Sequence, residues 1–157
     1  MIIIELKEKE RVLTNTKLSQ TYIRFKELLS ELRIRELPHT VIERINQDVE
    51  ELNLTFLNGD GLRKLIERKQ TKIIQMLEKE LKIVPKNYYQ NYWLAIGMTA
   101  FGLPIGVVYG LCIMNNIGML AIGLPIGMGI GVCLGSWLDK KSFKEGRQLN
   151  VKIDKTF

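Results

Sequence analysis

Eight basic side chains in the segment 63–86 are the residues of this sequence best suited to bind a ligand. The segment holds only three acidic residues, Glu67, Glu78 and Glu80. Clustered Lys and Arg release counterions from phosphates, so the cluster predicts a site for a polyanion such as a nucleic acid or nucleotide. The alternative is contact with anionic lipid headgroups, because the segment leads into an apolar region. The eight residues are Arg63, Lys64, Arg68, Lys69, Lys72, Lys79, Lys82 and Lys86.

No pattern for catalysis or for metal binding is found. The single histidine, His39, follows a helix-opening proline and is interpreted as a surface or cap residue. There is no glycine-rich phosphate loop with a lysine, no nucleophile motif and no carboxylate pair in an apolar setting. Cys112 and Cys133 both fall within apolar stretches. We therefore expect no enzyme, no cofactor and no metal.

The stretch from Tyr92 to Leu138 holds 47 residues without Asp, Glu, Lys, Arg or His. As helices, Tyr92–Met114 and Ile117–Leu138 would each be about 33 Å long, enough to cross a hydrocarbon core of about 30 Å. Only Asn115 and Asn116 separate them. The stretch therefore predicts a transmembrane helical hairpin.

Glycines recur every fourth residue in both predicted spans, which places them on one face of each helix. Missing side chains let backbones approach closely, and such contact drives much helix association in lipid. We expect a glycine zipper that joins several chains, a tetramer above all. The alternative is a packing face within one hairpin. The glycines are Gly102, Gly106, Gly110, Gly123, Gly127, Gly131 and Gly135.

The motif Gly-Leu-Pro-Ile-Gly occurs at 102–106 and again at 123–127, an internal repeat with an offset of 21. Each proline lacks a backbone donor and should loosen its helix near the membrane centre. Pro104 and Pro125 are therefore candidates for a gating hinge, and a harmless bend is the alternative.

Aromatic residues gather where the hairpin begins and ends, as in an interfacial belt that anchors membrane helices. Basic residues flank the same two ends, while the Asn115–Asn116 turn is uncharged, so both termini are expected on the cytoplasmic side of a bacterial inner membrane. No cleavable signal peptide is expected, because the apolar start Met1–Ile4 is followed at once by the charged Glu5 and is too short for a signal sequence. The belt consists of Tyr88, Tyr89, Tyr92, Trp93 and Trp137.

Before the hairpin, apolar positions alternate spacings of three and four in three segments, which predicts three amphipathic helices. They suggest a small bundle or a coiled-coil stem. The expected fold is all-α, a cytoplasmic helical bundle followed by a two-helix transmembrane hairpin. The expected divisions are a helical domain at 1–84, a juxtamembrane linker at 85–91, the hairpin at 92–138 and a basic tail at 139–157.

The segments Ile83–Tyr89, Gly123–Gly131, Asp139–Lys141 and Gly146–Leu149 resemble those of small bacterial glycine-zipper membrane proteins. The order of a helical domain and such a hairpin also resembles the membrane effector of Hailong-type anti-phage systems. That resemblance implies an oligomeric ion channel held shut by single-stranded DNA from a partner nucleotidyltransferase. It assigns no DNA-contacting residue to this chain.

These patterns together predict a homo-oligomeric ion channel gated by its cytoplasmic domain through an anionic ligand. The spans offer only uncharged candidates for a pore lining, and such a lining would favour weak selectivity. The alternative is a non-conducting, membrane-anchored helical scaffold. The lining candidates are Thr99, Asn115, Asn116 and Ser136.

Overall fold

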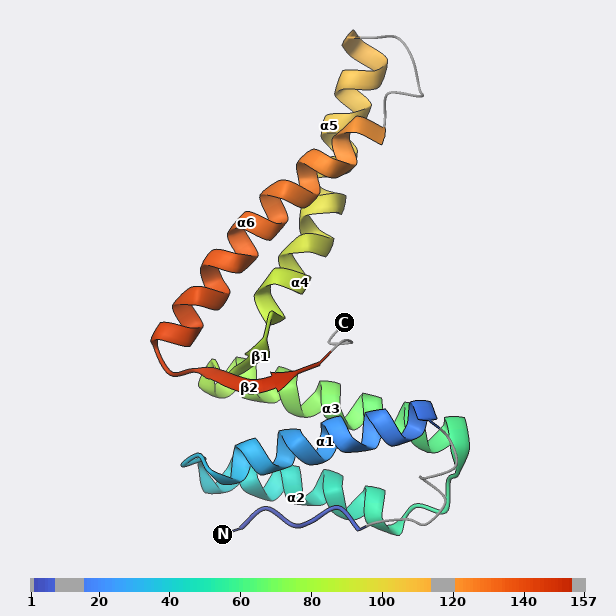
Figure 1. The fold of residues 1–157 in the computed structure, drawn as a ribbon, viewed down its shortest axis with the longest axis vertical. Helices are drawn as coiled ribbons and strands as arrows, with labels where there is room; N and C mark the ends of the chain where they lie inside the picture. The colour runs from blue at the N-terminus through green and yellow to red at the C-terminus, as the bar shows by residue number, and fades with distance from the viewer. Residues whose placement is uncertain (1, 8–15, 114–120, 154–157) are drawn as a thin grey trace. The chain divides into compact units, whose positions relative to one another are not determined.

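The computed structural model describes residues 2–7, 16–113 and 121–153, with no account of the side chains of 111–113. The protein is mostly helical. It divides into two compact units, one formed by residues 1–85 with 149–157 and the other by residues 86–148 (Figure 1). The first unit holds the three amphipathic helices, and the second holds the apolar hairpin.

The first unit is built on α1 (Thr16–Arg33), α2 (His39–Leu54) and α3 (Gly59–Leu81). The predicted apolar stripes form its core, in which Phe25, Ile45 and Ile73 are fully buried. α3 ends where Lys82 adopts a left-handed conformation, with the Ile83 N–H bonded to the Leu77 carbonyl. This pattern satisfies carbonyls that the end of a helix leaves without partners.

Residues 2–7 are extended and are held by two asparagines of α2. Asn46 bonds the backbone at Ile4, with 2.8 Å from the Ile4 nitrogen to Oδ1, and Asn53 bonds the Lys7 nitrogen at 2.9 Å. Asn46 and Asn53 lie seven residues apart on a helix, and their partners Ile4 and Lys7 lie three residues apart on an extended segment. Both separations are about 10 Å, so the two amides meet successive sites on the segment. Ile3 and Leu6 are buried as a result.

Two short strands complete this unit and differ from the all-α expectation. β1 (Val84–Lys86) and β2 (Gln148–Lys152) pair in parallel. Alternation in β2 buries Leu149 and Val151, and Ile153 follows in the same register. The described part of the expected tail, 139–153, is thus divided between the end of a helix and a core strand, and the expected linker at 85–91 is mostly strand and helix.

The second unit is a hairpin of two helical arms that lie side by side (Figure 1). The first arm consists of α4 (Tyr88–Ile96), the π-helical segment η2 (Gly97–Gly102), α5 (Leu103–Val107) and the π-helical segment η3 (Val108–Ile113). The second arm is α6 (Gly123–Lys144). Asn115 and Asn116 lie outside the described residues.

The two prolines occupy different local structures. Pro104 lies in the first turn of α5, directly after η2. Its ring would clash with the carbonyl four residues earlier in a regular helix, and the wider π turn accommodates it. Pro125 lies in the first turn of α6, where its missing donor is not needed.

Candidate functional site in the apolar hairpin

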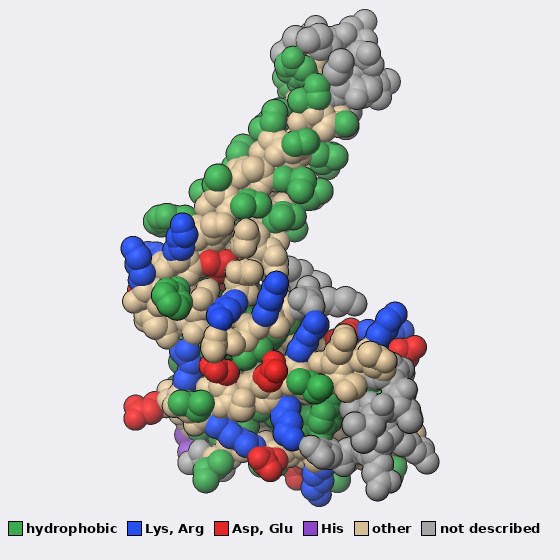
Figure 2. Space-filling view, in the orientation of Figure 1, with side chains coloured by type: hydrophobic (Ala, Val, Ile, Leu, Met, Phe, Trp, Pro, Cys, Tyr) green, Lys and Arg blue, Asp and Glu red, His purple; other side chains and the backbone are tan. Residues whose placement is uncertain are grey.

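The outer surface of the hairpin is apolar. On the face shown in Figure 2, hydrophobic side chains are spread along the hairpin among backbone atoms, and Lys and Arg side chains lie at its lower end. Among the described residues, one helical stretch, Tyr88–Gly110, is long and apolar enough to cross a membrane, and only 22% of its most apolar window is buried. The core helix of a soluble protein would be mostly buried. α6 does not meet the same criterion within the described residues.

The glycines of α6 face the other arm of the same hairpin. A Cβ added to Gly123, Gly127, Gly131 or Gly135 would lie less than 3.0 Å from backbone atoms of the first arm. Contacts that close leave no space for a side chain, so α6 requires glycine at these four positions. We call the contact between the two arms the glycine seam.

The first arm contributes Gly102 and Gly106 to the glycine seam, and also Gly97, which the four-residue spacing did not predict. A Cβ on Gly97 would meet the backbone of Gly127 and Gly131. Gly97 lies five residues before Gly102, and the i→i+5 bonding of η2 brings it onto the same face. Gly110 is buried at the far end of the described arm. Within the chain, the glycines of the seam therefore pack against the other arm, and a zipper between chains stays a prediction.

Asp139 links the two arms at the open end of the hairpin, the end at which α4 begins and α6 ends. Its Oδ1 accepts the Tyr89 N–H at 3.2 Å, and its Oδ2 accepts the Gln90 N–H at 3.0 Å. Asn87, at the amino-terminal cap position of α4, makes no side-chain cap bond, so the carboxylate of α6 supplies the cap instead. Burial raises the pKa of Asp139 and outweighs these two hydrogen bonds, which act to lower it.

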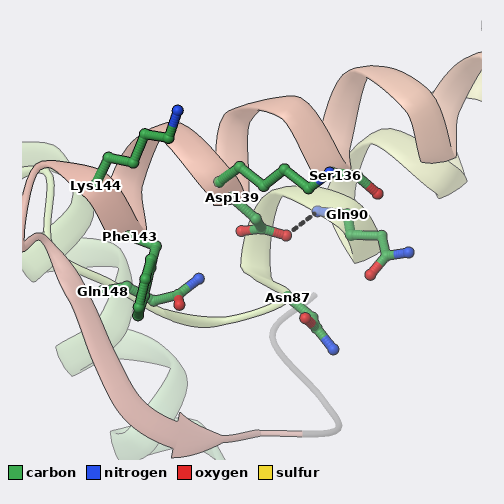
Figure 3. Close-up of a pocket in the computed structure, with 8 residues that line it drawn as sticks. Asn87, Gln90, Ser136, Asp139, Phe143, Lys144 and Gln148 are labelled. Carbon is green, nitrogen blue, oxygen red and sulfur yellow. Dashed lines mark hydrogen bonds between the residues drawn. The ribbon is translucent and has the colours of Figure 1, made fainter.

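Asp139 also lines an open groove of about 420 Å³ at this end of the hairpin. Figure 3 shows its carboxylate directed from α6 toward the α4 backbone at Gln90, with Asn87 nearby. Lys144 extends upward from the end of α6 in this view. Polar side chains and one aromatic ring form the groove, namely those of Asn87, Gln90, Ser136, Asp139, Lys140, Phe143, Lys144 and Gln148.

The aromatic residues of the expected belt differ in exposure. Tyr92 and Trp137 are exposed, whereas Tyr88 is buried and meets Tyr89 edge to face at 5.3 Å between ring centroids. Trp93 is partly buried and contacts Tyr92 in the same manner. Tyr92 comes from the start of the first arm and Trp137 from the later part of α6, so both exposed rings lie toward the same end of the hairpin, as an interfacial anchor requires.

Several members of the basic cluster are neutralised within the first unit. Arg63 pairs with Asp60 and Glu67, at 3.2 and 2.7 Å. Lys82 lies 3.6 Å from Glu78. Such ion pairs reduce the charge available to a ligand.

The buried Asp48 binds two further members, Lys69 at 2.7 Å and Lys72 at 2.9 Å. Burial lowers the pKa of Lys69, but its hydrogen bonds to Asp48 and Glu51 outweigh burial and raise it. Lys69 is therefore a structural cation rather than an available ligand contact.

The remaining charge lies mainly on one face of α3. At 100° per residue, positions 64, 68 and 79 fall within about 60° of the helix circumference. Lys64, Arg68 and Lys79 are exposed there. His39 is exposed at the start of α2, and the described residues contain no group of His, Cys, Asp or Glu that could hold a metal ion.

No protein-family model matches the chain, and no curated protein and no solved structure matches it significantly. The fold and the site therefore define a mostly helical protein with an apolar, glycine-packed hairpin, one arm of which is long enough to cross a membrane.

Proposed function

We propose that the chain is an integral protein of a bacterial inner membrane, in which several copies form an ion-conducting pore. The observation that carries this proposal is the largely exposed apolar helix Tyr88–Gly110. Burial of apolar surface stabilises by about 25 cal/mol per Å², so an arm this exposed is far more stable in lipid than in water. α6 would return across the bilayer, with both termini in the cytoplasm.

The glycine seam makes each hairpin a preassembled pair of helices, and assembly of several hairpins then uses the outer face of α6. Pro125, Gly129 and Cys133 lie four residues apart and are exposed. A Cβ on Gly129 would meet nothing within 4 Å, in contrast to the glycines of the seam. A second hairpin can approach closely along such a face. A tetramer is the assembly we propose.

A pore between hairpins would be lined by uncharged groups. Thr99 is exposed, and its hydroxyl donates to the Ala95 carbonyl at 3.0 Å, which leaves the oxygen available as an acceptor. Ser136 is partly exposed near the end of α6. Such a lining favours weak ion selectivity, and an apolar constriction in it closes the pore by dewetting.

The helical unit is the proposed gate. Its basic α3 face suits an anionic ligand, and the resemblance to Hailong-type effectors implies single-stranded DNA made by a nucleotidyltransferase. An effector role in anti-phage defence would follow, because a pore opened during infection arrests the host cell.

A second function, the non-conducting membrane anchor, is favoured by the glycine seam itself. The close contacts that could have joined chains are satisfied within one hairpin. In this alternative the hairpin only tethers the helical unit, which would bind a partner.

Recording from purified full-length protein in planar bilayers separates the two functions. The pore predicts current that short single-stranded DNA suppresses, and Lys64→Glu with Arg68→Glu and Lys79→Glu should remove the suppression. A matched variant, Lys7→Glu with Lys17→Glu and Lys26→Glu, changes the charge equally and should not. Absence of current with and without DNA would refute the pore and favour the anchor, and current unaffected by DNA would remove the nucleic-acid gate.

A further inference from the structure

We propose that the groove at the open end of the hairpin binds the phosphate of an anionic phospholipid headgroup. The inference rests on the proposed membrane insertion of the hairpin, since only an inserted hairpin brings this groove to lipid. All residues of the groove belong to the hairpin unit.

Two lysines supply the charge that a phosphate requires. Lys140 and Lys144 lie four residues apart on α6, so they share one face, and both line the groove. Both are exposed, and within the described residues neither makes an ion pair. Either ammonium can therefore rotate into the groove without breaking an existing contact. Lysine binds phosphate as a point charge with three donors.

The carboxylate of Asp139 does not cancel this charge. Its two oxygens already accept backbone N–H groups of α4, and the residue is only 7% exposed. The ammonium groups of Lys140 and Lys144 together outnumber the single carboxylate of Asp139, so the groove has a net positive charge. The side-chain amides of Asn87 and Gln90 add uncharged donors at its edge.

Aromatic side chains place the groove at the lipid headgroup level. Phe143 lines it and is 70% exposed, and Trp137, at the end of the charge-free part of α6, is 62% exposed. Exposed rings at the end of an apolar helix lie at the membrane interface. A lipid gains contact with Phe143 and the apolar arms through its acyl chains, whereas free phosphate gains nothing from them. The chemistry therefore favours a lipid source.

Lys141 provides a matched control. It is exposed on the same helix with the same charge, but it does not line the groove, and its Nζ lies 5.8 Å from the centroid of the Trp137 ring. A general attraction of basic residues to the membrane would involve all three lysines equally. A specific groove would involve only Lys140 and Lys144.

The test is native mass spectrometry of the full chain titrated with phosphatidylglycerol, with phosphatidylcholine and glycerol 3-phosphate in parallel. Lys140→Gln and Lys144→Gln should each weaken phosphatidylglycerol binding about fivefold, as expected for one lysine near an anionic lipid, and Lys141→Gln should change it less than twofold. Binding to phosphatidylcholine should be weaker. Equal losses in all three variants would overturn the site, and equally tight binding of glycerol 3-phosphate would overturn the lipid source.

Membrane insertion is measured separately by resistance of the protein to carbonate extraction from cells. Extraction of the unmodified protein by carbonate would show that it is not inserted and would refute the proposed function itself. Normal insertion with no preference between Lys140, Lys144 and Lys141 would refute only the lipid groove. Circular dichroism of each variant checks that the helices remain formed.

Discussion

Replacement of Asp139 by alanine should loosen the open end of the hairpin. The change removes the acceptor of the Tyr89 and Gln90 N–H groups, which lie 3.2 and 3.0 Å from its oxygens. Loss of a helix cap costs about 1 kcal/mol, and hydrogen bonds to a charged group contribute about 1.5–3 kcal/mol. For the charged carboxylate, burial outweighs the extra strength of these bonds, as its raised pKa indicates, so the loss stays near that of a helix cap. We therefore expect Asp139→Ala to destabilise the hairpin by about 1–2 kcal/mol.

Asp139→Asn separates hydrogen bonding from charge. The amide keeps one acceptor oxygen and removes the cost of burying a charge, so it should cost less than alanine. The folded pKa of Asp139 lies above its unfolded value, so its contribution to stability is largest below the unfolded pKa and decreases as pH rises through the folded pKa. The asparagine variant should lack this decrease.

The measurement is SDS titration of the purified protein in mild detergent at several pH values, with loss of helix detected by circular dichroism. Glu145→Gln is the control, because Glu145 is exposed near the same end of α6 and pairs locally with Arg147. Equal effects of Asp139→Ala and Glu145→Gln on stability would refute the cap. If the Asp139→Asn substitution left the dependence of stability on pH unchanged, the direction of the Asp139 pKa shift would be refuted.

Two further changes test the glycine seam and the strand. Gly127→Leu places a side chain against the first arm and should destabilise the hairpin by about 3 kcal/mol or more in SDS titration, whereas Gly129→Leu should leave the hairpin intact and weaken only cross-linked oligomers. Equal effects on the hairpin would contradict the seam. Val151→Asp buries a charge in the first unit and should lower its free energy of unfolding by at least about 3 kcal/mol, measured by thermal unfolding. The control Asn150→Asp changes an exposed neighbour and should change this free energy by less than about 0.5 kcal/mol. A Val151→Asp protein as stable as the parent would show that β2 is not part of the core.

Periodicity predicted the helical core well, because amphipathic helices carry their burial pattern in the chain. The five apolar positions at alternating spacings of three and four in the first helix are all buried, namely Leu18, Tyr22, Phe25, Leu29 and Leu32. The strand β2 was missed although Leu149, Val151 and Ile153 alternate, since a single short strand is identified only by its partner, and β1 lies more than 60 residues earlier.

The candidate site was predicted in part. The glycine faces could be identified from spacing, but spacing alone does not say whether the facing helix belongs to the same chain. Gly97 was missed because its position depends on a π-helical turn, which has no simple sequence signature. Asp139 had a signal that was not used: it continues the four-residue register of Gly127, Gly131 and Gly135 by one step, and so lies on the seam face of α6.

The basic cluster shows a different limit. Its residues were read as one group, but Lys69 and Lys72 share the buried carboxylate of Asp48, which lies on another helix. Ion pairs between helices depend on packing geometry that a linear charge count does not contain. The exposed face with Lys64, Arg68 and Lys79 keeps the predicted availability.

Two-sided cysteine labelling in intact cells tests the central claim that the hairpin crosses the membrane. Cys112 and Cys133 are first replaced by serine, and single cysteines are then introduced by Asn115→Cys and Lys141→Cys. A membrane-impermeant maleimide should label the Asn115→Cys protein from outside the cell, and should label the Lys141→Cys protein only after the cells are opened. Labelling of the Lys141→Cys protein in intact cells, or protection of the Asn115→Cys protein there, would contradict a spanning hairpin with both termini inside.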